Sequence, residues 1–463
     1  MNSLINHLVK KYQGNVPRYT SYPTPDRWSA QPDTLSLERK LRLLMQRGEP
    51  VSLYIHIPFC QRLCYYCACN TLIRSRDKAP TNQYLDNLEL EFKVISELAG
   101  GQLNIRQIHL GGGTPTFLTE PQLEWLVQAC HKYFQTSQAT EISFETDPDT
   151  CTGAQLKLLH ELGASRVSFG VQDFDPKVQE SVNRHNCPEH VQDIVGYARG
   201  LGYKSVNLDF IYGLPYQTID TALETTERIA EIRPDRIAMY NFAYLPEAKK
   251  HHRLLPVGEL PSPEGKALIF LGMSQRLHRH GYEPVGMDHF ALPGDELSMA
   301  AKTGSLMRNF MGYTPCKAPH VLGTGMTGIS FLDNHYFQNV STLGSYDEML
   351  GKGKPPVIRS YGLTPQDIQC KAIIDDLMCN LRIDPGAFQR EFHVPLEDAF
   401  PGIGHHIRQC FQDKLLAKRY TADSVAYSVT TVGRLFLRPI ASGFDPYLQD
   451  KPSQSIPMFS KAV

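Results

Sequence analysis

Four cysteines lie within ten residues of one another, in the segment Cys60-Gln-Arg-Leu-Cys64-Tyr-Tyr-Cys67-Ala-Cys69. The whole chain contains only eleven cysteines, so this clustering indicates a shared chemical task. Spacings of four and three residues allow the first three thiolates to reach three corners of one iron–sulfur cube. If the fourth iron has no protein ligand, such a cluster can bind and reduce a small molecule.

Two other uses of these cysteines fit less well. A structural zinc site usually takes four ligands from two separated Cys-x-x-Cys pairs, and the sequence contains no second pair. Disulfide frameworks are typical of short secreted chains, whereas this one has 463 residues and starts without the apolar core of a leader peptide. We therefore favour the iron–sulfur interpretation. Six other cysteines are expected to be buried and unreactive: Cys130, Cys151, Cys187, Cys370, Cys379 and Cys410.

The overall composition indicates an ordinary globular protein. The chain has a net charge of -1, with 41% hydrophobic and 21% charged residues. This balance predicts binding to neither nucleic acid nor a membrane surface, and no apolar run approaches the roughly 20 residues that span a bilayer. A reducing cytoplasm would suit both the thiols and an oxygen-sensitive cluster, so we expect a cytoplasmic location.

The middle of the chain alternates between short apolar runs and longer stretches with helical periodicity. The apolar runs predict strands over 52–58, 106–112, 140–146, 166–172, 205–212 and 236–243. The intervening stretches predict helices over 82–98, 120–133, 154–162, 190–201 and 219–232. This alternation is typical of parallel β-α units, in either a doubly wound sheet or an incomplete barrel. Residues with chemical potential follow nearly every strand, which favours an α/β fold built as a partial (β/α)6 TIM-like barrel.

Three regions are expected along the chain. Residues 1–50 form an N-terminal arm, in which the prolines of 17–25 exclude a helix. Residues 51–343 form the barrel and an extension that includes a helix over 261–281. Residues 344–463 form a small, mostly helical C-terminal domain. That domain begins with a Gly-, Pro- and Lys-rich linker over 344–365, followed by a helix over 365–381 and a winged-helix-like hairpin of 414–420 with 425–431.

Three strand ends carry residues suited to ligand binding. Gly111-Gly-Gly-Thr-Pro115 follows the second strand, where glycines either bring the backbone close to a ligand or simply make a tight turn. Glu145 ends the third strand, and a carboxylate there can accept two hydrogen bonds from a ribose diol. Gln172 ends the fourth strand.

Three charged residues complete the set. Asp209 lies inside a very apolar strand, where a charge is costly unless it is paired. We therefore expect Asp209 to face a polar lumen beside a cation. Arg184 is either a binding residue or a solvated helix arginine, and Asp147 is expected to cap a helix.

Taken together, these motifs resemble the radical S-adenosylmethionine (SAM) superfamily, and more closely the oxygen-independent coproporphyrinogen III oxidase family. The likeness runs from about residue 10 to about residue 450. It is carried by the cysteine and glycine motifs above and by these segments: Pro17-Arg-Tyr-Thr-Ser-Tyr-Pro-Thr24, Tyr54-Ile-His-Ile-Pro-Phe-Cys60, Cys67-Ala-Cys69-Asn70, Gly170-Val-Gln-Asp-Phe174, Ile211-Tyr-Gly-Leu-Pro215, Gly286-Met-Asp-His-Phe290 and Arg308-Asn-Phe-Met-Gly-Tyr313.

The resemblance implies a cofactor and a reaction. Cys60, Cys64 and Cys67 would hold a [4Fe–4S] cluster, whose open iron would bind SAM. One electron from the cluster would cleave SAM, and the resulting 5′-deoxyadenosyl radical would remove hydrogen from a propionate of coproporphyrinogen III. Loss of carbon dioxide and one electron would leave a vinyl group, and two such events would give protoporphyrinogen IX for haem biosynthesis. An electron donor such as flavodoxin or ferredoxin, and a monomeric enzyme, are also expected.

The resemblance also assigns individual residues. A first SAM molecule would contact Tyr54, Gly112 and Glu145. A second SAM molecule would contact Tyr66, Gly113, Thr114, Gln172, Arg184 and Asp209, with Ala243 and Ile329 completing the nucleotide pocket. Cys69 matches a fourth family cysteine that is not a cluster ligand, and we place it near the substrate. Because four propionates need cationic partners, Arg18 and Arg308 are assigned to the catalytic site and Lys302 is a further candidate.

Two departures and two rival functions remain. His320 stands where the family more often has an acidic residue, and Arg438-Pro-Ile-Ala-Ser-Gly-Phe-Asp445 keeps only the outline of its motif. A haem-chaperone branch shares the barrel and cysteine loop, but generally lacks the N-terminal segment, the Cys-x-Cys ending and the C-terminal domain. A radical enzyme that modifies RNA or peptides is a weaker alternative, since the sequence has no basic stripe.

Overall fold

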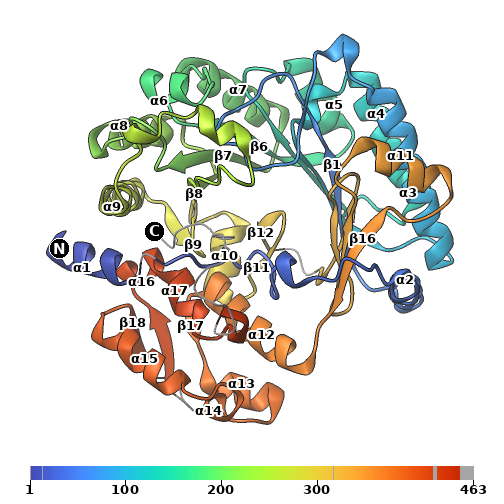
Figure 1. Cartoon of the computed structure of the whole chain (residues 1–463). Coiled ribbons are helices and arrows are strands. Elements are labelled where there is room, and N and C mark those ends of the chain that lie inside the picture. The colour runs from blue at the N-terminus through green and yellow to red at the C-terminus, as the bar shows by residue number, and fades with distance from the viewer. Residues whose placement is uncertain (1, 13, 316–317, 421–424, 449–463) are drawn as a thin grey trace.

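The structure, a computed structural model, describes residues 2–12, 14–315, 318–420 and 425–448. A twelve-stranded sheet forms its centre, in the order β16-β15-β14-β13-β1-β4-β5-β6-β7-β8-β10-β9. The six predicted parallel strands are confirmed as β1 (Val51–Ile57), β4 (Ile105–Gly112), β5 (Glu141–Thr146), β6 (Ala164–Gln172), β7 (Ser205–Tyr212) and β8 (Arg236–Asn241). The sheet is strongly curved but open, so the barrel is partial, as the sequence predicts (Figure 1).

Helices cover the outer face of the parallel strands (Figure 1). They are α3 (Thr81–Ala99), α4 (Glu120–Tyr133), α5 (Gly153–Glu161), α7 (Pro188–Leu201), α8 (Ile219–Ile232) and α9 (Pro263–Arg279). Each lies within two residues of its predicted bounds. Threonines fix several starts: Thr152 accepts a hydrogen bond from the backbone of Gln155, and Thr218 does the same for Thr221. The six-residue helix α6 (Pro176–Ser181) is not predicted from the sequence.

The lumen face of these strands is unusually polar. Because side chains alternate between the two faces of a strand, every second residue points away from the covering helices. In register across the sheet, His109 lies opposite Ser143, which lies opposite Arg166, which lies opposite Ser205. The residues between them, such as Phe144, are fully buried in the apolar core. The same strands therefore supply an apolar outer core and a polar interior.

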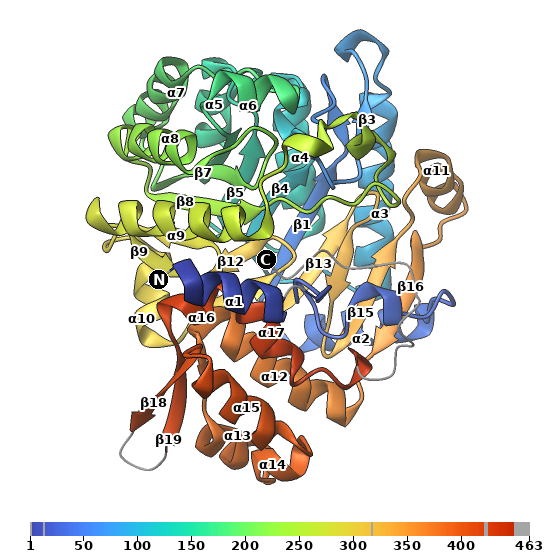
Figure 2. The same ribbon diagram turned by 60° about the vertical axis from the view of Figure 1, so that its left-hand side comes forward.

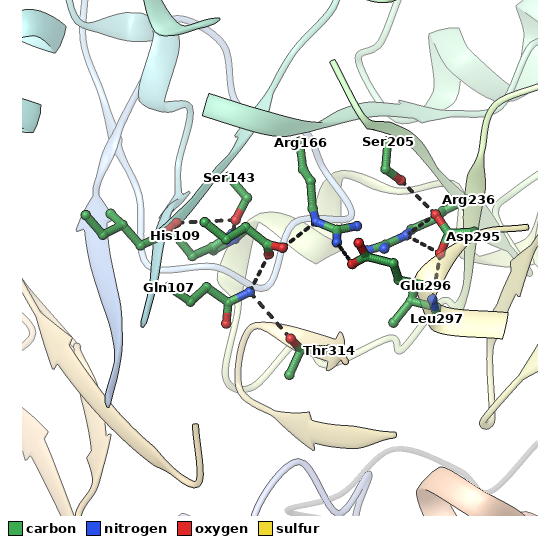
Figure 3. Close-up of polar contacts among 12 residues, drawn as sticks. Gln107, His109, Ser143, Arg166, Ser205, Arg236, Asp295, Glu296, Leu297 and Thr314 are labelled. Carbon is green, nitrogen blue, oxygen red and sulfur yellow. Dashed lines mark hydrogen bonds and ion pairs between the residues drawn. The ribbon is translucent and has the colours of Figure 1, made fainter. Parts of the chain in front are cut away.

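Ion pairs line the amino-terminal end of this lumen (Figure 3). Arg166 binds Glu141 at 2.7 Å and also pairs with Glu296, at the start of α10 (Glu296–Thr303). Arg236 donates to both carboxylate oxygens of Asp295, at 2.8 and 2.9 Å. The contacts tie β5, β6 and β8 to α10, so paired charges line this end of the lumen.

The sheet extends beyond the parallel strands on both sides. On one side it continues through β13 (His320–Thr324), which runs parallel to β1, and then antiparallel through β14 (Ile329–Phe331), β15 (His335–Asn339) and β16 (Val357–Gly362). On the other side it ends with β10 (His289–Ala291) and β9 (Glu283–Val285). A separate hairpin of β11 (Met307–Asn309) and β12 (Gly312–Thr314) lies across the lumen.

The prediction of a linker over 344–365 is wrong. The segment instead contains most of helix α11 (Leu343–Gly351) and all of β16, which pairs with β15. Thr342 caps the helix by accepting a hydrogen bond from the backbone of Ser345. The glycines and lysines of this segment therefore lie in and around regular elements. Strand β16 lies beyond residue 344 and belongs to the central sheet. The domain boundary near residue 344 stays a prediction.

The C-terminal region is mostly helical, as expected. Its helices are α12 (Pro365–Asn380), α13 (Pro385–Phe392), α14 (Leu396–Ala399), α15 (Ile403–Gln412), α16 (Thr431–Leu435) and α17 (Leu437–Ser442). The predicted hairpin is confirmed as β18 (Leu416–Tyr420) paired with β19 (Val425–Val429), and β17 (Arg382–Ile383) joins it. Figure 2 shows this region below the barrel.

The N-terminal arm runs between the barrel and the C-terminal region. It contains two helices that the sequence analysis did not predict, α1 (Asn2–Tyr12) and α2 (Thr34–Arg47), while residues 17–25 contain no α-helix, as expected. The buried hydroxyls of Tyr19 and Tyr22 donate hydrogen bonds to Asp445, at 3.0 and 3.3 Å. These hydrogen bonds hold the N-terminal arm against the C-terminal region. Within the described ranges, no helix has the length and hydrophobicity needed to cross a lipid bilayer.

Candidate cluster and substrate site

The cysteine loop begins where β1 ends, at the carboxyl edge of the parallel sheet. Short strands β2 (Phe59–Cys60) and β3 (Leu72–Ile73) pair at its base, and the backbone of Leu72 donates to Pro58 at 2.7 Å. Cys60, Cys64 and Cys67 are half-buried, whereas Cys69 is exposed. All four cysteines line one cavity of about 180 Å³. The local fold therefore gathers the cysteines as their spacing predicts.

The surroundings of the thiols fit an iron–sulfur cluster. Burial raises the pKa of Cys60 to about 12 and also raises that of Cys64, so these thiols are neutral until a metal or cation compensates their charge. A hydrogen bond from the Cys69 thiol lowers the pKa of Cys67 to about 7. Arg184 Nη1 lies 3.8 Å from Cys64 Sγ. Three thiols beside a cation are a donor set suited to a cluster.

The three thiols line the same cavity without converging on one point. Among the described residues, no three His, Cys, Asp or Glu side chains lie close enough to hold a metal ion as they stand. Binding a cluster would therefore bring the sulfurs of the loop closer together. Cys130, Cys151, Cys370, Cys379 and Cys410 are buried as expected, but Cys187 is exposed, so that part of the prediction is wrong.

The glycine turn after β4 presses against the cysteine loop. Gly112 has a φ of +115°, and a Cβ there would lie 2.5 Å from the ring of His56. A Cβ on Gly113 would lie 2.8 Å from the backbone oxygen of Phe59. The backbone N–H of Thr114 donates to the same oxygen at 3.0 Å. Only glycine allows the glycine turn and the cysteine loop to approach this closely, and this holds with or without a bound ligand.

Glu145 is held as a charged acceptor at the end of β5. The backbone N–H of Gly112 lies 3.3 Å from one carboxylate oxygen, and His109 Nε2 lies 3.4 Å from the other. Burial opposes the charge, but hydrogen bonds with His109 and Gly112 keep the pKa of Glu145 below its usual value. The Tyr54 ring stacks on His109, and its hydroxyl lies 3.0 Å from His56 Nδ1.

Arg184 is a buried, paired cation rather than a solvated one. Its guanidinium donates to both oxygens of Asp147, at 2.5 and 3.2 Å, and to the carbonyl of Gly170. Only 8% of its side chain is exposed. Asp147 therefore pairs with an arginine instead of capping a helix. Gln172 ends β6 with a φ of +76°, at a bulge between β6 and β7 that turns its side chain toward the same cavity.

Asp209 faces the polar lumen, as predicted, but its hydrogen-bond partners are neutral. Ser168 Oγ donates to it at 3.1 Å and Asn207 Nδ2 at 2.7 Å. Burial, reinforced by the charge of Glu145, raises the pKa of Asp209 to about 7. Asp209 lines both the cysteine cavity and a neighbouring lumen cavity of about 110 Å³. It stands at the junction of the two spaces.

Arg18 reaches the same region from the N-terminal arm. Its Nη2 lies 3.2 Å from a carboxylate oxygen of Asp288, and its guanidinium lies 5.6 Å from the centre of the Tyr240 ring. His289 Nδ1 contacts the other oxygen of Asp288 at 2.8 Å. Despite burial, His289 and Arg18 hold the pKa of Asp288 well below its usual range. A fixed anion therefore positions the Arg18 cation beside the lumen.

Arg308 and Lys302 have different surroundings. Arg308 lies on β11 and donates to the backbone oxygen of Tyr19 at 2.8 Å, so it contacts the arm next to Arg18. Lys302 instead forms an exposed ion pair with Glu283 at 2.7 Å, and it does not line the cysteine cavity or the lumen cavity. The structure thus groups the two arginines and separates the lysine.

The cysteine cavity collects most of the residues that the sequence analysis assigned to cofactors. Its lining includes Cys60, Cys64, Cys67, Cys69, Tyr66, Gly112, Gly113, Thr114, Glu145, Gln172, Arg184 and Asp209. Tyr54 contacts this lining through His109, whereas Ala243 and Ile329 are not part of it. His320 pairs with Glu49 at 2.6 Å at the start of β13.

Several polar residues of this region are not predicted from the sequence. His56 and His109 support Tyr54 and Glu145, Asp147 holds Arg184, and Asp288 holds Arg18. For His109 a signal exists in the sequence, because polar residues alternate with apolar ones along β4 to β8. Asp147 and Asp288 gave no such signal, since their partners are distant in sequence.

Comparisons with known proteins agree with this site. The Radical SAM superfamily pattern matches residues 54–229. Oxygen-independent coproporphyrinogen III oxidases from Pseudomonas aeruginosa and Escherichia coli are 36% and 37% identical, and each alignment covers 98% of both chains. The solved structure of coproporphyrinogen III oxidase from Escherichia coli, a radical SAM enzyme, superposes with a TM-score of 0.86 over 96% of this chain and 98% of that one, at 36% identity.

The fold and the three-cysteine site therefore define a radical SAM enzyme, a class that uses a [4Fe–4S] cluster and SAM. Within that class, the relatives match the chain almost from end to end. The chain belongs to the oxygen-independent coproporphyrinogen III oxidase family, and it is an oxidoreductase.

Proposed function

We propose that this chain converts coproporphyrinogen III into protoporphyrinogen IX, by oxidative decarboxylation of two propionate side chains to vinyl groups in haem biosynthesis. The observation that carries the proposal is the cavity shared by three cysteines, Glu145 and Arg184, in a chain that matches named coproporphyrinogen III oxidases over 98% of its length. When bound, the cluster and SAM supply the radical that takes hydrogen from a propionate side chain.

The chain's own residues would bind and orient these groups. Cys60, Cys64 and Cys67 would hold the cluster, and the Glu145 carboxylate would accept hydrogen bonds from the ribose hydroxyls of SAM. Tyr54, stacked on His109, would close one side of that nucleotide.

A second SAM molecule in the neighbouring lumen is part of the proposal. Gln172, Arg184, Asp209 and Tyr66 line the cysteine cavity; the first three would contact the second molecule, and Tyr66 would stack on its adenine. Support comes from Glu145 and Asp209, which line both the cysteine cavity and the lumen cavity. A titration with radiolabelled SAM, under anaerobic conditions, should reach two molecules per chain; saturation at one would refute this stoichiometry.

Substrate binding is assigned to the arginines beside the N-terminal arm. Arg18 and Arg308 would pair with propionate groups, because a guanidinium binds a carboxylate through two parallel hydrogen bonds. The Asp288 carboxylate keeps Arg18 beside the lumen until the substrate arrives. We also propose that the enzyme acts as a monomer in the cytoplasm and takes its electrons from a small carrier protein.

Anaerobic reconstitution with iron and sulfide tests the function. The reconstituted protein should cleave SAM, and coproporphyrinogen should be consumed with release of two carbon dioxide molecules per molecule. Zinc in place of iron, or SAM cleavage that never yields a vinyl porphyrinogen, would contradict the proposal.

A pair of variants separates the cluster ligands from Cys69. Cys64→Ser should lose bound iron, whereas Cys69→Ser should keep the iron and lose turnover. Retention of iron by Cys64→Ser would contradict the ligand assignment. The relatives reported above are named coproporphyrinogen III oxidases, so the haem-chaperone alternative gains no support from them.

A further inference from the structure

Positive charge is concentrated on the outside of the cysteine loop. Residues 61–80 and 245–260 together contain seven Lys or Arg but only three Asp or Glu. The chain as a whole has 47 basic and 48 acidic residues, so this excess is local. Two ion pairs consume part of it, since Arg62 contacts Asp149 at 3.5 Å and Arg253 contacts Glu247 at 3.1 Å. A net positive surface remains.

The second segment is fastened directly onto the cysteine loop. Lys249 Nζ donates to the backbone oxygen of Cys69 at 3.0 Å, and His251 Nε2 lies 2.7 Å from the backbone oxygen of Cys67. The segment then forms two short 3-10 turns, η4 (Lys250–Leu254) and η5 (Val257–Glu259). Figure 2 shows the yellow-green turns of this segment beside β3. The segment that contains these turns therefore packs against the backbone of Cys67 and Cys69.

Apolar side chains are exposed among the charges. Leu254 is 60% exposed and Val257 is 45% exposed. Their neighbours Leu255 and Leu260 point inward and pack in the cluster that includes Tyr65 and Tyr66. Leu254 and Val257 are therefore not needed to fill the core beneath them. A small apolar patch surrounded by charged residues is typical of a protein interface.

We propose that this surface is the docking site for an acidic protein that carries one electron at low potential. We call it the basic rim, and define it by Arg74, Lys78, Lys249, Lys250, Arg253, Leu254 and Val257. The inference rests on the proposed function, because that reaction needs one electron delivered to the cysteine-bound cluster for each SAM cleaved. The partner is oxidised by one electron and the cluster is reduced by one, and no bond between the proteins forms.

Two physical arguments favour this position over the rest of the surface. Electron transfer slows steeply with distance, so a carrier must approach the cysteines closely. The basic rim lies against the backbone of Cys67 and Cys69, whereas the opposite side of the site faces the lumen cavity. Transient redox complexes are small and depend on complementary charge for fast association, which fits a compact basic rim.

Binding to the cluster-free protein is the first test. Purified flavodoxin with a fluorescent label serves as the probe, and anisotropy measures its dissociation constant at low and high salt. We expect Lys250→Glu/Arg253→Glu to weaken binding about tenfold, and salt to weaken binding by the unaltered chain. The matched control is Lys418→Glu/Arg419→Glu, two exposed basic residues on β18 at the other end of the molecule (Figure 2). Equal effects of the two double variants, or no binding of flavodoxin or of a ferredoxin, would overturn the proposal.

Crosslinking locates the contact independently. A carbodiimide joins flavodoxin carboxylates to lysines that touch them, and peptide mapping should find Lys78, Lys249 or Lys250. Crosslinks confined to lysines outside the basic rim would contradict the assignment.

Turnover with two reductants distinguishes docking from chemistry. With reduced flavodoxin as donor, Lys250→Glu/Arg253→Glu should lose most of its turnover, but with dithionite it should match the unaltered enzyme. Loss with both reductants would show that these residues serve the fold, and would refute docking. If the unaltered enzyme has no turnover even with dithionite, the proposed function fails, and the binding and crosslinking results still decide the docking site.

Discussion

Replacing Arg184 by methionine should destabilise the protein strongly. Only 8% of its side chain is exposed, and the guanidinium forms two hydrogen bonds to Asp147, one to Gly170 and a contact to Cys64. The variant Arg184→Met would leave the Asp147 carboxylate, only 18% exposed, without its cation. Removing one partner of a buried ion pair costs about 3–5 kcal/mol, because the remaining charge stays desolvated. Anaerobic urea unfolding of the cluster-free protein measures this loss.

Arg62 offers a matched control in the same part of the fold. It pairs with Asp149 at 3.5 Å, but 45% of its side chain is exposed, so Arg62→Met should cost only about 0–1 kcal/mol. Adding Asp147→Asn to Arg184→Met should restore part of the stability, since the stranded charge is removed. If both single variants lose the same stability, or if the double variant is less stable than Arg184→Met, the interpretation of Arg184 as a buried counterion is refuted.

Two further predictions follow from the geometry. Gly112→Ala should abolish SAM binding in equilibrium dialysis, because the added Cβ would lie 2.5 Å from the His56 ring at a φ of +115°. The control variant Gly196→Ala, on α7 with open space around the residue, should bind SAM normally. Normal SAM binding by both variants would refute the close approach of Gly112 to His56. Burial raises the pKa of Glu91 to about 7, so the folded protein holds this proton more tightly than the unfolded chain, whose glutamates titrate near about 4.3. The stabilisation from protonated Glu91 is complete below about pH 4.3 and is lost as the pH rises through about 7, by about 4 kcal/mol in total. Glu91→Gln should remove that part of the pH dependence of unfolding, and an unchanged slope would contradict it.

The sequence alone predicted the cysteine chemistry and the succession of parallel β-α units. The spacing of the cysteines is local, so it is visible in the sequence without knowledge of the fold. The alternation of strands and helices likewise produces apolar runs that can be recognised in the sequence. The six parallel strands and the helices between them lie close to their predicted bounds for this reason. The motifs at the strand ends then identified the family that the comparisons confirm.

Tertiary structure alone decided which charges meet. Asp147 and Arg184 are 37 residues apart, and Arg18 and Asp288 are 270 residues apart, so no local pattern joins them. The linker over 344–365 was wrong because β16 is stabilised by its pairing with β15, and pairing between strands depends on the partner more than on local composition. The positive surface over the cysteines likewise arises only when 245–260 folds back onto 61–80, since a neutral chain can still concentrate charge wherever its fold brings distant segments together.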